Sequence, residues 1–368
     1  MLKKFVLTYV PALKFVVLVL LIGIGTRDRV TKFVEPGKDS ETYVTAITSF
    51  LEGKNPYEQT VKSYENINDV GGHGFAYFPG FLYLLGALYV FTLKTGVNFD
   101  IIWKTTVLLF DLGIGVLLYK HLVKSSYFIA IFGALVWLLN PYLKADYTSY
   151  SLLDPIPIFF ILLALLYIEK DNVLTAVFFT ISIVFKPFAL VFIPLFIVKS
   201  KNKLEFVTAC ALVFTAVSLP FLVSIDSALT YIKGSLLVHG SRVLQGRPFL
   251  FYLSYYYKIE LFQIIPLAFY SSMATFFGWV LIVAGRYVLK IRDVFVLAAL
   301  AGVNFLLFTP VLNRTYLLWF LPIFIICAHE ISKHYKKMYL YYFPLLVYWG
   351  FCYWYLNQWK DGFHVWHP

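Results

Sequence analysis

Long apolar runs recur along this chain of 368 residues and limit the folds open to it. A run of about 18 residues or more is long enough to cross a bilayer as an α-helix. Charged residues are scarce: they make up 14% of the chain, whereas soluble proteins average about 25%. We therefore expect an all-α fold, a polytopic transmembrane helix bundle of about 9 to 11 apolar segments in one membrane-embedded domain over residues 1–368. The expected segments cover about residues 9–25, 75–93, 101–123, 126–142, 151–168, 172–198, 204–225, 261–285, 293–310, 315–330 and 338–356.

The positions of Lys and Arg predict how the segments are oriented. The net charge of +11 is spread over short basic clusters between apolar runs, which suits a membrane surface better than a nucleic-acid partner. Such clusters concentrate in cytoplasmic loops. Residues 3–4, 120–124, 199–203, 286–292 and 333–337 should therefore lie inside, with a retained first helix. The first outer loop (26–74), the second outer loop (226–260) and the turns at 143–154 and 309–315 then face outward from the cell membrane.

Two stretches conflict with a simple alternation of crossings. Residues 75–123 hold two apolar runs but must make one net crossing, so one run is partial or re-entrant. Residues 172–198 have polar residues of the cytoplasmic kind at both ends, which predicts a hairpin broken at Lys186-Pro187. Proline lacks the backbone N–H and disfavours a helical residue before it. Broken helices are tolerated in membranes only where they are buried in protein or line a cavity.

The first outer loop contains two neighbouring acids, Asp39 and Glu41. The loop is too long for a hairpin turn, so we expect it to be structured and to carry amphipathic surface helices, one of them over Ser40 to Leu51. A carboxylate at the mouth of a helix bundle can act as a general base, and two can hold a divalent cation such as Mg²⁺ or Mn²⁺. Alternatively, Asp39 is only the cap of that helix. The apolar face of the helix should consist of Tyr43, Ile47, Phe50 and Leu51.

Further polar candidates lie at the outer ends of other segments. Asp154 stands before Pro155 at the start of an apolar run, as a supporting acid or as a helix initiator. The second outer loop carries His239, Arg242 and Arg247. Arginine binds phosphate with two parallel hydrogen bonds, although these residues could also form an exposed basic loop.

Lys186 lies inside an apolar run, where a charge is costly and is a functional candidate by default. Alternatively, it extends to the interface or pairs with an acid such as Asp111. Arg314 precedes Tyr316 and Trp319, whose rings could be ordinary interfacial aromatics. Acids and bases together at one membrane face suit an anionic lipid substrate.

Several short motifs follow one another in a characteristic order over about residues 25–320. They are Asp39 to Tyr57, Tyr77-Phe78-Pro79-Gly80, Trp137-Leu138-Leu139-Asn140-Pro141, Ser151 to Pro155, Phe185-Lys186-Pro187 and Arg314 to Trp319. In this order they resemble the GT-C superfamily of multi-pass glycosyltransferases. The pattern is most similar to that of the GPI mannosyltransferase I catalytic subunit and the related bacterial polyprenol-phosphate-mannose-dependent mannosyltransferases.

The resemblance implies a hexosyltransferase that takes a hexose, expected to be mannose, from a polyprenyl-phosphate donor to a lipid or glycan acceptor at the extracytoplasmic membrane face, with inversion. It also implies that Asp39 is the catalytic acid of the first loop. The family often carries Asp-x-Asp, whereas here the second acid is Glu41, so the need for a metal stays open. We expect Tyr77 and Tyr316 to line the substrate site. Negative charge accumulates on the phosphate as the sugar leaves, and its expected partners are Lys186, His239, Arg242, Arg247 and Arg314.

Two other classes of function fit the same composition. A transporter or flippase of lipid-linked sugars commonly shows inverted repeats and paired broken helices near the bilayer midplane. Here one broken helix is clear, and two acids lie in an outer loop, which favours the enzyme. The third class is an assembly scaffold without chemistry.

Overall fold

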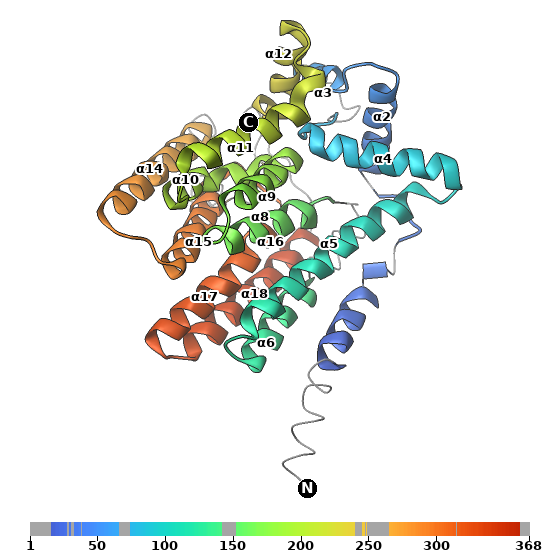
Figure 1. Ribbon diagram of the computed structural model, residues 1–368. Coiled ribbons are helices and arrows are strands. Elements are labelled where there is room, and N and C mark those ends of the chain that lie inside the picture. Colours follow the sequence, from blue (N-terminus) through green and yellow to red (C-terminus); the bar gives the residue numbers. More distant parts are fainter. Residues whose placement is uncertain are drawn as a thin grey trace, which may run out of the picture.

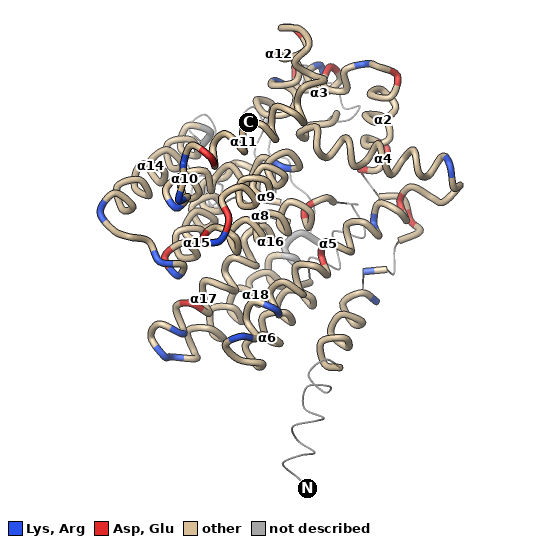
Figure 2. The backbone as a smooth tube through the Cα atoms, in the orientation of Figure 1, with Lys and Arg blue, Asp and Glu red and all other residues tan. Residues whose placement is uncertain are grey.

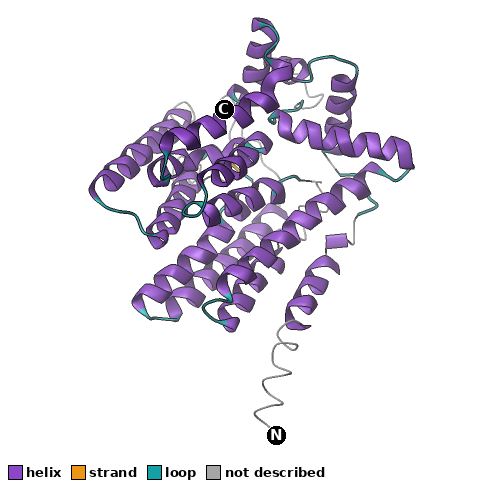
Figure 3. Cartoon of the chain, in the orientation of Figure 1, coloured by secondary structure: helices purple, strands orange, loops and turns teal. Residues whose placement is uncertain are grey.

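The structure, a computed structural model, describes residues 16–27, 29–30, 33–37, 39–65, 74–141, 152–239, 245–246, 248, 265–313 and 315–360. At residues 239, 245–246, 265–266 and 356–360 it describes the backbone alone. This part of the chain is almost entirely helical, which confirms the all-α class (Figure 1, Figure 3).

The elements follow one another along the chain as a series of helices. An apolar helix over Val16–Arg27 comes first. It is followed by α2 (Ser40–Leu51), α3 (Tyr57–Glu65), α4 (Pro79–Thr95), α5 (Phe99–Leu122), α6 (Tyr127–Leu138), α8 (Pro155–Tyr167), α9 (Asn172–Phe185), η2 (Pro187–Phe192), α10 (Ile193–Lys199), α11 (Lys203–Ser218), η3 (Leu219–Phe221), α12 (Ile225–Ser235), η4 (Leu237–His239), α14 (Ile265–Arg286), α15 (Ile291–Phe308), α16 (Tyr316–Trp319), α17 (Leu321–Tyr335) and α18 (Tyr339–Lys360). Two short strands, β1 (Gln245–Gly246) and β2 (Val311–Leu312), pair in parallel.

Four of the described helical segments are long and apolar enough to cross a membrane. They are Phe99–Leu122, Lys203–Phe221, Leu267–Arg286 and Ile291–Phe308. Length and composition thus indicate a helical membrane protein, as expected. Of the two runs within 75–123, only α5 meets these criteria, and α4 packs against α2 of the first outer loop (Figure 1). This makes α4 the better candidate for the partial segment that the sequence requires.

The expected break within residues 172–198 is confirmed. Helix α9 ends at Phe185, Lys186 is extended (φ −153°, ψ 128°), and the 3-10 helix η2 starts at Pro187. The two ends of the hairpin meet, because the Asn172 side chain hydrogen-bonds the backbone of residues 201 and 202. Residues 172 and 201–202 thus lie at one end of the bundle, and Lys186 lies at the tip of the hairpin.

The amphipathic helix expected in the first outer loop is confirmed as α2, with the same bounds. Tyr43 and Ile47 are buried on its inner face, and Phe50 is half-buried. Leu51 was wrongly assigned to this face, since 52% of it is exposed. At about 100° per residue, Leu51 lies about 80° around the helix from Tyr43, at the edge of the packed face.

The basic loops gather at the end of the bundle away from α2, α3 and α12 (Figure 2). Lys199 connects two of them and the turn at Glu169: its ammonium donates to the backbone carbonyl of Leu289 and lies 2.7 Å from a carboxylate oxygen of Glu169. Clusters that are far apart in sequence therefore share one end, as expected if they face one side of a membrane.

Impermeant thiol labelling of intact cells is expected to modify a Lys54→Cys variant, because the first outer loop is predicted to face outward. Lys54 suits the test, since 70% of its side chain is exposed. The native Cys210, Cys327 and Cys352 are first replaced by Ala. A matched Lys201→Cys variant, exposed in a basic loop, should react only after lysis. Labelling at position 54 that also requires lysis contradicts the predicted orientation.

Candidate functional site

Asp154 and Lys186 form an ion pair at the open end of the antiparallel pair α8 and α9, opposite the turn that joins the two helices. Asp154 immediately precedes α8 and Lys186 immediately follows α9, so the antiparallel pairing of the two helices brings them together. The ammonium nitrogen lies 2.6 Å from Oδ1 of Asp154. The Asp154 side chain is fully buried, and 13% of the Lys186 side chain is exposed. Two candidates that are 32 residues apart in sequence thus belong to one site.

Three aromatic rings surround the ammonium of Lys186. Its nitrogen lies 4.5 Å from the ring centre of Trp319, 5.8 Å from that of Tyr316 and 6.0 Å from that of Tyr77. Such distances allow the ring faces to attract the cation. The indole N–H of Trp319 also donates to Oδ1 of Asp154. Tyr77 and Tyr316, the residues predicted to line the substrate, are therefore next to the predicted phosphate ligand.

The second carboxylate oxygen of Asp154, Oδ2, is buried without a hydrogen-bond partner among the described residues. Buried carboxylate oxygens almost always accept hydrogen bonds, so an open acceptor is unusual. Helix α8 does begin directly after Asp154 with Pro155 in its first turn, as the helix-initiation alternative predicts, but the Asp154 side chain makes no capping hydrogen bond. The described partners of the Asp154 carboxylate are Lys186 and Trp319.

Asp39 stands at the first turn of α2 and is half-buried. Its side chain makes no capping hydrogen bond to α2, so the capping alternative finds no support. One turn later, the hydroxyl of Tyr43 is buried within electrostatic reach of two acids. Burial raises the pKa of Tyr43 well above its usual value, and the neighbouring Tyr77 and the charges of Asp39 and Asp154 raise this pKa further. The Tyr43 ring lies 6.4 Å from that of Tyr77, which in turn lies next to Lys186, so Tyr77 connects the start of α2 to the Asp154–Lys186 pair.

Glu41 differs from Asp39, because its side chain is exposed. The structure therefore does not bring the two acids of the first loop to a common buried position. Within the described ranges, no group of three or more His, Cys, Asp or Glu side chains could hold a metal ion.

The alternative partner suggested for Lys186, Asp111, was wrong. Asp111 forms a buried ion pair with Arg29 at the end of the first apolar helix, and it accepts a hydrogen bond of 2.9 Å from the indole of Trp137. Arg29 also donates to the backbone carbonyl of Leu138 at 2.8 Å. Sequence reasoning missed Arg29.

The predicted arginines of the phosphate site, Arg242, Arg247 and Arg314, lie outside the described residues, as does the side chain of His239. The described backbone near them still constrains the site. Strands β1 and β2 pair Gln245 with Val311, so the second outer loop runs beside the turn before α16.

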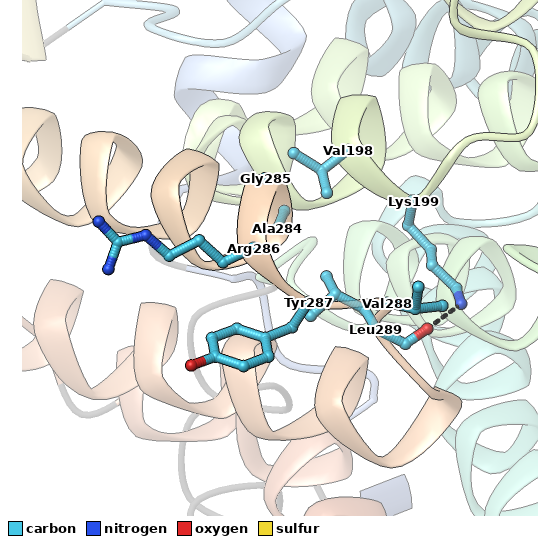
Figure 4. A pocket seen from close by; sticks show the side chains of 8 residues that line it. All are labelled: Val198, Lys199, Ala284, Gly285, Arg286, Tyr287, Val288 and Leu289. Carbon is cyan, nitrogen blue, oxygen red and sulfur yellow. Dashed lines mark hydrogen bonds between the residues drawn. The ribbon is translucent and has the colours of Figure 1, made fainter.

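A surface hollow of about 350 Å³ lies elsewhere, between α10 and the turn from α14 to α15 (Figure 4). Lys199, Leu289 and Arg286 are among the residues that line it, and the side chain of Arg286 extends away from the other two (Figure 4). It belongs to the basic end of the bundle, and none of the candidate site residues contributes to it.

The candidate site thus combines two carboxylates, a lysine at a helix break and several tyrosine and tryptophan rings. A half-buried carboxylate can accept a proton, and a lysine ammonium can neutralise an anion. No protein-family model matches the chain, and no similar protein is found among curated proteins. The function must therefore be argued from the site itself.

Proposed function

We propose that the protein is a membrane glycosyltransferase that moves a hexose, with mannose the first candidate, from a polyprenyl-phosphate donor to a lipid or glycan acceptor at the extracytoplasmic face. The observation that carries the proposal is geometric: the Tyr77 ring lies 6.0 Å from the ammonium of Lys186, which pairs with Asp154, and 6.4 Å from the ring of Tyr43, one turn after Asp39. The three charged residues come from separate parts of the chain, and Asp154 and Lys186 meet at the open end of the α8–α9 pair.

Asp39 is suited to act as the general base. In the proposed step, its carboxylate takes the proton of the acceptor hydroxyl, whose oxygen attacks the anomeric carbon from the face opposite the phosphate. The bond between that carbon and the phosphate oxygen breaks, and the polyprenyl phosphate leaves with the bonding electrons. The configuration at the anomeric carbon is inverted.

Lys186 is suited to neutralise the leaving phosphate. An ammonium has three N–H donors, and Asp154 takes one of them. Its charge is held in place by the carboxylate and the surrounding rings, so it needs little rearrangement as negative charge develops on the phosphate. Asp154 would then orient Lys186, and its free Oδ2 acceptor suits a hydroxyl of the bound sugar.

The lengths of α8 and α9 fit a lipid headgroup that reaches into the bundle. The helices contain 13 and 14 residues, which corresponds to about 20 Å each, less than the ~30 Å hydrocarbon core of a bilayer. Charged groups and non-helical backbone at such a depth require burial in protein or a polar cavity. The anionic headgroup of a lipid substrate can enter such a site.

The direct test uses the purified protein with polyprenyl-phosphate mannose, polyprenyl-phosphate glucose and a panel of lipid and glycan acceptors. Transfer of the sugar with release of polyprenyl phosphate supports the proposal, and the anomeric configuration of the product tests inversion. The break at Lys186 also suits a transporter, so the same donors are assayed for flipping in proteoliposomes. Movement of an intact donor without transfer would favour the transporter.

Each residue that contacts the phosphate should bind the donor more weakly when it is replaced by Ala. The residues to be replaced, one at a time, are His239, Arg242, Arg247 and Arg314. A charged hydrogen bond contributes about 1.5–3 kcal/mol, which corresponds to an increase of about 10- to 150-fold in the apparent donor Kd. Arg292→Ala, at the basic end, serves as the control and should leave the Kd unchanged. If none of the four substitutions changes it, the phosphate is bound elsewhere, and Lys186 becomes the first candidate.

A further inference from the structure

The segment that carries Asp39 is attached to the first turns of α5 by two buried charged side chains. Oδ1 of Asp100 accepts hydrogen bonds from the backbone N–H of Gly37 at 3.0 Å and from the hydroxyl of Ser40 at 2.5 Å. The ammonium of Lys104 donates to the backbone carbonyl of Glu35 at 2.5 Å. Only 9% of Asp100 and 3% of Lys104 are exposed.

The spacing of these contacts is informative, because Gly37 and Ser40 lie on either side of Asp39. A single carboxylate oxygen of Asp100 therefore holds both sides of the proposed base. The same part of α5 contributes Trp103, whose ring lies edge-on to that of Tyr43 with 6.2 Å between ring centres. The start of α2 is thus attached to α5 before and after Asp39.

The start of α5 does not require the Asp100 carboxylate as a cap. The side chain of Asn98 caps the helix, since it accepts hydrogen bonds from the backbone N–H groups of Asp100 at 2.8 Å and Ile101 at 3.4 Å. Burial of charged groups is costly unless they are paired and hydrogen-bonded. Both buried charges bind the 35–40 segment, which indicates that their role is to hold that segment in place.

We propose that Asp100 and Lys104 are positioning residues that fix Asp39 relative to the Asp154–Lys186 pair; this role rests on the proposed function. Neither residue contacts substrate in this scheme. A displacement of about 1 Å in a reacting group can cost about 100-fold in rate. Loss of the Asp100 contacts should therefore affect turnover far more than donor binding.

The kinetic test compares Asp100→Ala with Asp100→Asn. The Ala variant lacks the acceptor and should show a kcat about 30- to 100-fold lower, with the donor KM within about threefold of the wild-type value. The Asn variant keeps an Oδ1 acceptor and should restore kcat to within about threefold. Asp226→Ala removes an exposed acid from the first turn of α12 and is the matched control, with unchanged kinetics. A kcat for Asp100→Ala close to that of the control, or an Asn variant as slow as the Ala variant, overturns the proposal.

Hydrogen–deuterium exchange tests the attachment without any assay of activity. Peptides covering residues 33–43 should exchange faster in Asp100→Ala and at the wild-type rate in Asp100→Asn. Ser40→Ala removes one of the two bonds, should give an intermediate rate and replaces Asp100→Ala if that variant does not fold. Unchanged exchange in these variants overturns the attachment. If the wild-type protein transfers no sugar but the exchange changes as expected, the proposed function has failed while the attachment stands.

Discussion

Replacement of Asp39 by Asn is expected to lower the rate of sugar transfer at least 100-fold while the protein remains folded. A general base typically contributes about 10²–10⁴ in rate, and an amide cannot accept the proton. The substitution keeps the shape of the side chain. Because the Asp39 side chain makes no capping hydrogen bond to α2, its replacement should not weaken that helix. The loss should therefore appear in the chemical step.

The measurement is the single-turnover rate with saturating donor and acceptor, together with the melting temperature of the purified variant. Glu41→Gln is the matched control, because it makes the same change of charge two residues away on an exposed side chain. Its rate should stay within about threefold of the wild-type rate. Near-native turnover by Asp39→Asn would remove Asp39 from the mechanism and make Asp154 or Glu41 the next candidate.

The second large effect is expected at the Asp154–Lys186 pair. Lys186→Met leaves the Asp154 carboxylate fully buried without its cationic partner. Removal of one member of a buried ion pair typically costs about 3–5 kcal/mol of stability. The double variant Asp154→Asn/Lys186→Met removes both charges and should recover most of that loss. Neither the single nor the double variant should transfer sugar, because the phosphate has lost its counter-charge.

Thermal unfolding in detergent and the transfer assay together separate stability from function. Lys199→Met is the control, since its partner Glu169 is 44% exposed and such pairs contribute about 0–1 kcal/mol. It should lower stability less than Lys186→Met. A folded double variant with near-native transfer would make the Asp154–Lys186 pair a purely structural contact.

Local patterns in the sequence were sufficient to predict the structural features that depend on residues close together along the chain. The bounds of α2 follow from its amphipathic pattern, and the break at Lys186 follows from the proline after it. Most expected apolar runs correspond to a described helix within a few residues, because burial in a bundle or a bilayer demands an apolar run.

Pairings between distant residues could not be predicted in this way. Lys186 had several possible acidic partners in the sequence, and the choice of Asp154 depends on how α8 and α9 pack. The contacts of Asp100 and Lys104 were missed for the same reason. A signal did exist, since both are charged residues at the start of an apolar run, spaced four apart on one side of a helix.

The buried contact between Arg29 and Asp111 has a consequence for how the protein is made. The two residues are 82 positions apart, so at about 5–20 residues per second Asp111 is synthesised roughly 4 to 16 s after Arg29. Until then the guanidinium of Arg29 has no counter-charge and must stay hydrated at the interface, which Arg side chains near helix ends achieve by extending out of the lipid. The first helix should therefore take its final position against the bundle only after α5 has been inserted into the membrane. Because α5 also carries Asp100, the part of the first outer loop around Asp39 would become attached at the same stage of biogenesis.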